Sequence, residues 1–186
     1  RMLERLGVEV MLESAVKNVN ELGVHLGSTF IESHNVIWAA GNAASPLLAT
    51  LGVDTDRAGR VVVDGSCRVP GLGDVFVIGD GAHFATPSGP LPAVAQVAMQ
   101  QGRYVSAIVR GRQSARPFRY KDYGSMATIG RAKAIAHVFG VKTSGFIAWM
   151  MWAALHVLQL ISFRNRLKVM VEWMWYYISF QPGARL

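Results

Sequence analysis

The chain has 186 residues, which is long enough for one ordinary domain or two small ones, and its single cysteine, Cys67, excludes an intramolecular disulfide. The composition is 51% hydrophobic and 17% charged, and the mean hydropathy of +0.25 indicates contact with a membrane. The net charge of +7 is unevenly placed, because residues 111–186 hold 11 of the 19 Lys and Arg but only 2 of the 12 Asp and Glu, a net charge of +9. Since these charges flank apolar runs rich in Trp and Met, they favour an anionic membrane surface over nucleic acid as the partner.

The first forty residues predict the closing part of an α/β domain. Residues 2–6 indicate the end of an amphipathic helix that Gly7 closes, and short apolar runs between turn residues predict strands at 8–12, 24–26 and 36–40. The opening segment lacks the continuous apolar core of a signal peptide. Since the chain starts within what reads as a helix, we expect that it is part of a longer protein.

Two continuous apolar runs, 61–63 and 75–78, read as buried strands. The second leads directly into Gly79 and Asp80, at the strand end where open α/β sheets bind ligands. Gly79 lets a cofactor approach the backbone closely, and Asp80 can accept hydrogen bonds from the hydroxyl groups of a ribose or a ribityl chain. The alternative interpretation is a tight turn with a solvated aspartate, because strands that end in Gly-Asp are common.

A loop rich in Pro and Gly, residues 86–92, precedes a helix predicted at 93–110. The free backbone N–H groups and the partial positive charge at the start of this helix can stabilise an anion, such as the N1/O2 side of a reduced flavin. The helix has an apolar face formed by Val94, Ala98, Val105 and Ile108 and a polar face formed by Gln96, Gln100 and Arg103.

The last part of the chain predicts a hairpin followed by helices. Residues 118–130 and 134–140 read as strands joined by a basic turn at 131–133, and residues 143–180 are helical in character. Residues 143–163 carry no Lys, Arg, Asp or Glu. A helix over this whole segment would be roughly 30 Å long, which is enough to cross a bilayer, so a transmembrane span is one alternative.

The final helical segment is amphipathic. Its polar stripe consists of Asn165, Lys168, Glu172, Tyr176 and Ser179, and its apolar stripe of Leu167, Val171, Met174, Trp175 and Ile178. Trp side chains beside basic residues suit the headgroup layer, so the pattern favours helices that lie on a membrane. A soluble helical hairpin buried in a dimer interface is the other alternative, and the same surface can serve both purposes.

Three ordered motifs, "VIWAAG", "VPGLGDVFVIGD" and "AVAQVAMQQG", resemble the second half of the flavoproteins with two dinucleotide-binding domains. With "YKDYGSMATIGRAKAIAHVFG" and "FRNRLKVMVEWMWYYISFQPGARL", the chain is similar to type II NADH dehydrogenases over nearly its whole length. The resemblance implies an α/β, Rossmann-like partial flavoprotein fold with a C-terminal membrane-associating helical region. It further implies that residues 1–40 end the NADH-binding domain, that 41–112 form the C-terminal part of the FAD-binding domain, and that 113–186 form a β-hairpin with amphipathic membrane-anchoring helices.

The resemblance also implies a set of FAD contacts. Gly79 and Asp80 would hold the ribityl-pyrophosphate region of FAD. Gly41 would lie in the segment that returns from the NADH domain towards FAD. Ala95 and Gln96, in the Ala-Gln pair at the start of the helix, would lie beside the isoalloxazine ring.

The implied activity is that of an FAD-dependent NADH:quinone oxidoreductase, which passes electrons from NADH via FAD to a membrane quinone without pumping protons. Gln96 would be the catalytic residue that borders the quinone pocket, with Gln100 one turn further along the helix. The family resemblance implies a peripheral enzyme on the cytoplasmic face of the cell inner membrane, and a homodimer. No metal and no nucleic acid are expected, and His83 and His156 are alternative candidates for proton delivery.

The sequence departs from the complete family pattern in one respect. No Gly-x-Gly-x-x-Gly loop occurs, although the family uses two, so this portion alone is expected to bind FAD poorly and to be inactive. Cys67 stands alone and cannot form the redox pair of a sulfide reductase. Two alternatives stay open: another FAD-dependent pyridine-nucleotide reductase, or a non-enzymatic membrane-anchoring module.

Overall fold

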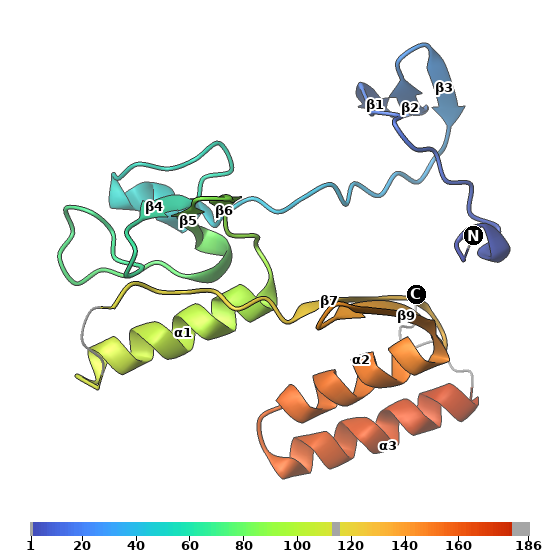
Figure 1. The fold of residues 1–186 in the computed structure, drawn as a ribbon. Helices are drawn as coiled ribbons and strands as arrows, with labels where there is room; N and C mark the ends of the chain where they lie inside the picture. The colour runs from blue at the N-terminus through green and yellow to red at the C-terminus, as the bar shows by residue number, and fades with distance from the viewer. Residues whose placement is uncertain (1, 113–115, 180–186) are drawn as a thin grey trace. The chain divides into compact units, whose positions relative to one another are not determined.

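The computed structural model describes residues 2–112 and 116–179 (Figure 1). The chain forms two compact units. One comprises Ala15–Asp122, and the other comprises Arg1–Ser14 together with Tyr123–Leu186. The structure of each unit follows from its own strands, helices and core.

The first unit begins with a small antiparallel sheet of β1 (Asn18–Asn20), β2 (Gly23–Leu26) and β3 (Thr29–Glu32), in that order. The turn into β2 is held by Asn20, whose side-chain oxygen accepts the backbone N–H groups of Leu22 and Gly23, each at 3.0 Å. The strand predicted at 24–26 is therefore confirmed as β2, whereas β1 and β3 are additional strands that the apolar pattern does not reveal.

The strands predicted at 8–12 and 36–40 are wrong. Both segments are irregular, and their apolar side chains are open to solvent: Leu12 is 80% exposed and Ile37 is 91% exposed. A strand needs a neighbour that pairs with its backbone groups, and neither segment has such a partner among the described residues.

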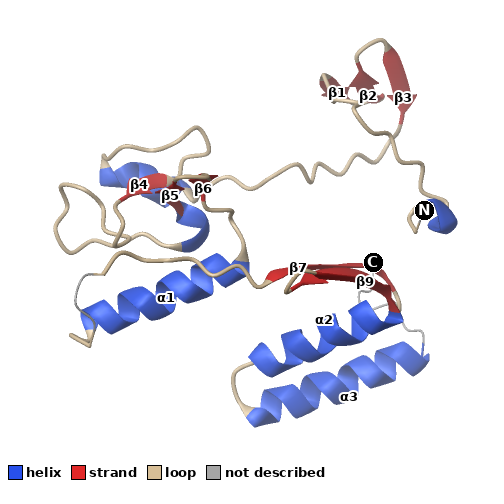
Figure 2. Ribbon diagram, in the orientation of Figure 1, coloured by secondary structure: helices blue, strands red, loops and turns tan. Residues whose placement is uncertain are grey.

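The same unit contains the sheet on which the candidate site is built. Strands β4 (Val61–Val63) and β5 (Ala82–Thr86) are parallel neighbours, with Val61 opposite Ala82, and β6 (Gly89–Pro90) pairs antiparallel with β5 (Figure 2). Two 3-10 helices, Pro46–Leu51 and Gly79–Gly81, and helix α1 (Ala95–Val109) complete this part. The strand predicted at 61–63 and the helix predicted at 93–110 are thus confirmed, the helix with slightly shorter bounds.

The core of this unit joins β4, β5 and α1. Its buried members are Val61, Val63, Cys67, Val69, Val77, Ala82, Phe84, Tyr104 and Phe118. Phe118 packs edge-on against both Phe84 and Tyr104, with ring centroids 5.5 Å and 5.4 Å apart. Its backbone N–H also donates to the carbonyl oxygen of Gly65 at 2.7 Å, so the chain that follows α1 is fixed to the core.

The predicted apolar face of α1 is only partly correct. The buried residues of the helix are Val97, Gln101 and Tyr104, while Val105 and Ile108 pack against the core without being fully covered. Val94 precedes the helix and is exposed. The buried stripe therefore includes Gln101, although sorting the helix into an apolar and a polar face would place a glutamine at the surface.

The second unit contains an antiparallel sheet and two helices. The sheet has the order β7 (Gly124–Gly130), β8 (Lys133–Val138), β9 (Val141–Gly145), and it is followed by α2 (Phe146–Gln159) and α3 (Phe163–Ser179). A small core of Ala134, Ala136 and Ala148 joins the sheet to α2. The helices lie side by side (Figure 2), and Trp152 of α2 stacks on Trp173 of α3 with ring centroids 5.6 Å apart.

The hairpin predicted with a basic turn at 131–133 is confirmed as β7 and β8, although its first strand starts at Gly124. The helix predicted at 2–6 is a short 3-10 helix, Glu4–Leu6, which does end at Gly7. The helical character predicted for 143–180 is confirmed in α2 and α3, but β9 takes residues up to Gly145, and Phe180 lies outside the described residues. Within residues 2–112 and 116–179, no helix combines the length and hydropathy needed to span a bilayer.

Candidate functional site

The candidate site centres on the turn at Gly79. The preceding residues 75–78, predicted as a buried strand, are extended but form only an isolated antiparallel bridge between Phe76 and Arg68, so the strand prediction is wrong. Val77 is nevertheless buried, and its N–H donates to the carbonyl oxygen of Cys67 at 3.1 Å. The segment thus delivers the chain to Gly79 in the extended conformation that the sequence predicts.

Gly79 is required at this position for two reasons. Its φ of +63° lies in the left-handed region, and a Cβ atom built there would stand 2.9 Å from the Cβ of Ala98 in α1. The turn is therefore seated directly against the second turn of the helix. A larger residue at position 79 would have to push the turn and α1 apart.

Gln101 joins the same turn from the helix side. Its side chain is 1% exposed, and its Oε1 atom accepts the backbone N–H of Gly79 at 2.7 Å. Sequence reasoning did not identify Gln101. The signal that was available is its spacing, because Gln101 lies four residues after Val97 and three before Tyr104, on the stripe that the helix buries.

Asp80 follows in the 3-10 helix Gly79–Gly81, and its side chain is exposed. Within the described part of the chain, its carboxylate has no hydrogen-bond or ion-pair partner. An acceptor of this kind, next to a rigid turn, is free to accept hydrogen bonds from the hydroxyl groups of a ligand.

Helix α1 begins at Ala95 without a side-chain cap. Val94 occupies the N-cap position in an extended conformation, and its carbonyl oxygen accepts the N–H groups of Val97 and Ala98. The positive end of the helix dipole is therefore not neutralised by a capping side chain or by an acid in the first turn. This end can stabilise a negative charge that a ligand carries or develops.

Gln96 lies in the first turn of α1, beside the chain that returns after the helix. Its Nε2 atom donates to Oδ1 of Asp122 at 3.5 Å, and the Tyr120 hydroxyl donates to the same oxygen at 3.5 Å. Burial, together with the neighbouring Asp122 carboxylate, raises the pKa of Tyr120. Gln96 is thus part of a polar group that also contains an acid and a phenol.

Gln100 is one turn further along and uses both ends of its amide. Its Nε2 donates to the carbonyl oxygen of Lys121 at 2.8 Å, and its Oε1 accepts the Lys121 N–H at 3.0 Å. The Gln100 amide and the Lys121 backbone thus exchange two hydrogen bonds, as paired residues of neighbouring strands do. These two bonds fix the returning chain beside the helix. Direct contact between Gln100 and a substrate would have to replace these bonds.

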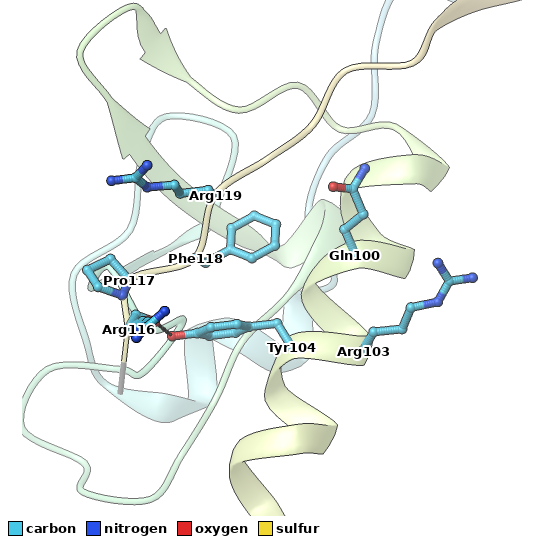
Figure 3. Close-up of a pocket in the computed structure, with 7 residues that line it drawn as sticks. All are labelled: Gln100, Arg103, Tyr104, Arg116, Pro117, Phe118 and Arg119. Atoms are coloured by element: carbon cyan, nitrogen blue, oxygen red, sulfur yellow. Dashed lines mark hydrogen bonds between the residues drawn. The ribbon is translucent and has the colours of Figure 1, made fainter. Parts of the chain in front are cut away.

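A groove of about 720 Å³ lies along the same helix (Figure 3). Its lining residues are Gln100, Arg103, Tyr104, Arg116, Pro117, Phe118 and Arg119. Gln100 and Arg103 project from α1 on one side, and Tyr104 crosses below Phe118 to donate its hydroxyl to the carbonyl oxygen of Arg116 at 2.5 Å. Neither Asp80 nor Gln96 lines this groove.

Gly41 is not joined to the other candidate residues by any described contact. It lies in an exposed irregular segment with a φ of +111°, and a Cβ atom there would meet nothing within 4 Å. The structure therefore brings Gly79, Asp80 and α1 into one local arrangement and leaves Gly41 outside it.

Asp56 forms a second polar cluster next to β5. Its carboxylate accepts the backbone N–H groups of Ala58 and Arg60 and the Arg60 guanidinium, and it lies 3.0 Å from Nδ1 of His83. Burial acts to raise the pKa of Asp56, but the hydrogen bonds from Arg60, His83 and Ala58 outweigh it and hold that pKa far below its usual range. His83 is thus engaged with Asp56.

Cys67 is fully buried in the core, and burial, with a further contribution from Asp64, raises the pKa of its thiol to about 12. A thiol with this pKa is protonated at neutral pH and is a poor nucleophile. The described residues also contain no group of three or more His, Cys, Asp or Glu side chains arranged to hold a metal ion.

Comparisons with known proteins agree with this architecture. The family model described as pyridine nucleotide-disulphide oxidoreductase matches residues 1–102, and the model described as the NDH2 C-terminal domain matches residues 123–179. The chain is 37% identical to the type II NADH:quinone oxidoreductase Ndh and 38% identical to NdhA, both from Mycobacterium tuberculosis. These alignments cover 97% and 100% of this chain and 42% of each relative, so the chain spans less than half the length of these relatives.

A solved structure of NDH2 from Plasmodium falciparum in complex with NADH has the same fold. The TM-score is 0.82 at 15% sequence identity, and the match covers 99% of this chain and 54% of that one. The predicted α/β, Rossmann-like fold class is thereby confirmed, as is the resemblance to type II NADH dehydrogenases. The chain belongs to the pyridine nucleotide-disulphide oxidoreductase family.

Proposed function

We propose that this chain forms part of an FAD-dependent NADH:quinone oxidoreductase, which passes electrons from NADH via FAD to a membrane quinone without pumping protons. The observation that carries the proposal is the Gly79 turn, which is locked against α1 and leaves the Asp80 carboxylate open to a ligand. The similarity to type II NADH:quinone oxidoreductases over 42% of their length supports the same reaction.

The donor and acceptor groups at the site fit a flavin dinucleotide. Asp80 offers an acceptor for ribityl hydroxyl groups, and the uncapped start of α1 at Ala95 offers partial positive charge for the pyrimidine edge of the flavin. Gly79 and Asp80 would hold the ribityl-pyrophosphate region, Ala95 and Gln96 would lie beside the isoalloxazine ring, and Gly41 would contribute from the segment leading into the domain. When bound, FAD supplies the two-electron chemistry, while NADH is the reducing substrate.

Gln96 is the residue we assign to quinone. Its primary amide can donate to a quinone carbonyl, and its neighbours Tyr120 and Asp122 supply groups that exchange protons. Gln100 would border the same pocket. Its bonds to Lys121 support a role in holding the returning chain in place beside Gln96, which keeps the pocket in shape.

We further propose that α2 and α3 hold the protein on a lipid surface. The outer face of α3 is apolar and more than half exposed; it consists of Leu167, Met170, Val171, Met174, Trp175 and Ile178. Ile147 and Leu158 of α2 are similarly exposed, and Arg164 and Lys168 provide charge for anionic headgroups. The protein would be peripheral, on the cytoplasmic face of the cell inner membrane, where quinone is dissolved.

The same apolar face can also be shared between two copies of the chain, and we propose a homodimer.

We propose that the chain divides into the end of an NADH-binding domain at 1–40, part of the FAD-binding domain at 41–112, and the membrane-anchoring region at 113–186. The change of family model between residues 102 and 123 supports the boundary between the second and third of these parts.

The test is the absorbance spectrum of the intact protein before and after NADH is added. We expect a yellow chromophore that NADH bleaches and that quinone restores faster than oxidised ferredoxin does. Asp80→Asn should weaken flavin binding by about tenfold, because a charge-assisted hydrogen bond is lost. The matched control Asp54→Asn changes an exposed aspartate outside the site and should leave flavin binding as it is. A protein without flavin would overturn the proposal.

A further inference from the structure

Gln101 has a polar side chain that is almost completely buried, and these two properties are rarely found together. It is the only polar residue among the buried side chains of the described residues, and its burial is nearly complete at 1% exposure. It follows Gln100 directly but points to the opposite environment, since Gln100 faces the returning chain and Gln101 faces the core. A buried amide is costly unless it is hydrogen-bonded, so its partner indicates what it is for.

Its Oε1 accepts a hydrogen bond from the backbone N–H of Gly79, 22 residues earlier, at 2.7 Å. Ile78 is extended, with φ −136° and ψ 166°, whereas Gly79 is left-handed, so the chain changes direction at this peptide. Residues 75–78 are not part of a described sheet ladder that would hold the Gly79 N–H. The side chain of Gln101 thus takes the place of a neighbouring strand as acceptor.

The consequence falls on Asp80, the next residue along the chain. We propose that Gln101 is a positioning residue that fixes the peptide between Ile78 and Gly79 and so presents the Asp80 carboxylate to the flavin. The proposal rests on the function proposed above. Gln101 acts through the backbone and touches neither flavin nor substrate.

A neutral side chain suits this position. The amide oxygen accepts the Gly79 N–H without bringing a formal charge into the core behind the flavin site. A carboxylate would accept the same hydrogen bond, but its charge would disfavour the negative charge that builds up on a reduced flavin. A thioether of similar length would fill the volume and leave the Gly79 N–H without a strong acceptor.

The competing explanation is that Gln101 merely contributes to packing between α1 and the core. Tyr104 provides the matched control, because it lies on the same buried stripe and also makes a part-buried hydrogen bond from its side chain to the backbone, to Arg116 rather than to the turn. Tyr104→Phe therefore removes one such bond from the same helix while leaving the Gly79 turn intact.

The experiment uses the intact protein and three variants, Gln101→Met, Gln101→Glu and Tyr104→Phe, with flavin dissociation constant, flavin reduction potential and thermal midpoint as readouts. We expect Gln101→Met to raise the flavin dissociation constant by about tenfold or more. Gln101→Glu should recover most of the affinity and shift the reduction potential to a more negative value. Tyr104→Phe should lower the thermal midpoint and leave both flavin properties within about twofold of wild type.

Two results would overturn the inference: flavin affinity unchanged in Gln101→Met, or flavin affinity that follows the thermal midpoint equally in Gln101→Met and Tyr104→Phe. If Gln101→Met does not fold, Gln101→Glu decides, because it keeps the acceptor; a flavin dissociation constant raised by about tenfold or more in Gln101→Glu would then contradict the proposal. These outcomes presuppose flavin in the wild-type protein. If the wild-type protein contains no flavin, the proposed function and this inference are refuted together. The spectrum of the wild-type protein reveals that outcome before any variant is made.

Discussion

Arg131 stacks its guanidinium over the ring of Tyr177 at 5.1 Å and donates a hydrogen bond to the carbonyl oxygen of the same residue at 3.2 Å. A second hydrogen bond reaches the carbonyl oxygen of Tyr176 at 2.9 Å. Arg131 lies in the turn between β7 and β8, while both tyrosines lie in the last turn of α3. The basic turn of the hairpin therefore satisfies carbonyl groups at the end of a helix that is distant in sequence.

We predict that Arg131→Gln destabilises the second unit by roughly 1 kcal/mol, because the helix end loses a cation and two hydrogen bonds. Chemical denaturation followed by Trp fluorescence measures the loss. Arg164→Gln is the control at the other end of α3, where a cation opposes the helix dipole, and it should be neutral or slightly stabilising. Equal losses in the two variants would show that the position of the charge along the helix is irrelevant.

Gln96→Leu is predicted to separate the two half-reactions. The leucine keeps the size of the side chain but cannot donate to a quinone carbonyl, so KM for quinone should rise by about tenfold. Stopped-flow reduction of the flavin by NADH should keep its wild-type rate. A slowed NADH half-reaction with an unchanged KM for quinone would assign Gln96 to the flavin alone.

The Asp56 cluster predicts a dependence of stability on pH. Because the pKa of Asp56 is lowered in the folded state, the cluster contributes fully above its ordinary pKa of 3.8, and the contribution is lost as the pH falls below that value. At pH 7, Asp56→Asn should cost roughly 1–3 kcal/mol of unfolding free energy. The difference from wild type should shrink progressively in denaturation curves recorded below pH 4.

Asp74→Asn is the control for this measurement. Asp74 pairs with Arg68 but is 94% exposed, so its loss should cost at most about 1 kcal/mol. A variant of Asp56 whose deficit stays constant from pH 7 to pH 3 would contradict the assignment of the effect to its carboxylate.

The exposed face of α3 predicts how the protein meets lipid. Val171→Glu places a charge in the middle of the apolar face and should weaken co-sedimentation with anionic vesicles by about tenfold. Asn165→Glu adds the same charge on the polar stripe and should have a much smaller effect. If Val171→Glu instead converts a dimer to a monomer in solution and vesicle binding is kept, the face serves the homodimer and not the membrane.

The elements that sequence reasoning identified are those with a strong local pattern. The run Val61–Val63, the long periodic segment of α1 and the basic turn of the β7–β8 hairpin each carry their own signal. The segment 75–78 carries the same apolar signal as β4 but pairs with its neighbour only at the bridge between Phe76 and Arg68, and the extent of pairing is a property of tertiary structure. The break at Gly145, with a φ of +80°, is concealed in an apolar stretch that reads as one helix.

The candidate site was predictable in its loop residues but not in its supports. Gly79 and Asp80 stand out as a pair after an apolar run. Gln101 does not, because a glutamine on a helix is expected at the surface, and only the orientation of the Gly79 N–H explains its burial. Gln100 was correctly placed one turn after Gln96, but its engagement with the Lys121 backbone depends on where the chain returns after the helix.

The fully enclosed Cys67 makes this portion of the protein convenient for site-specific labelling. Its thiol is the only one in these 186 residues, and both its inaccessibility and its high pKa suppress reaction with maleimides in the native state. A cysteine introduced on the outer face of α3 would accordingly carry a fluorophore or spin label without competition from Cys67, while labelling of Cys67 itself would report the opening of the core.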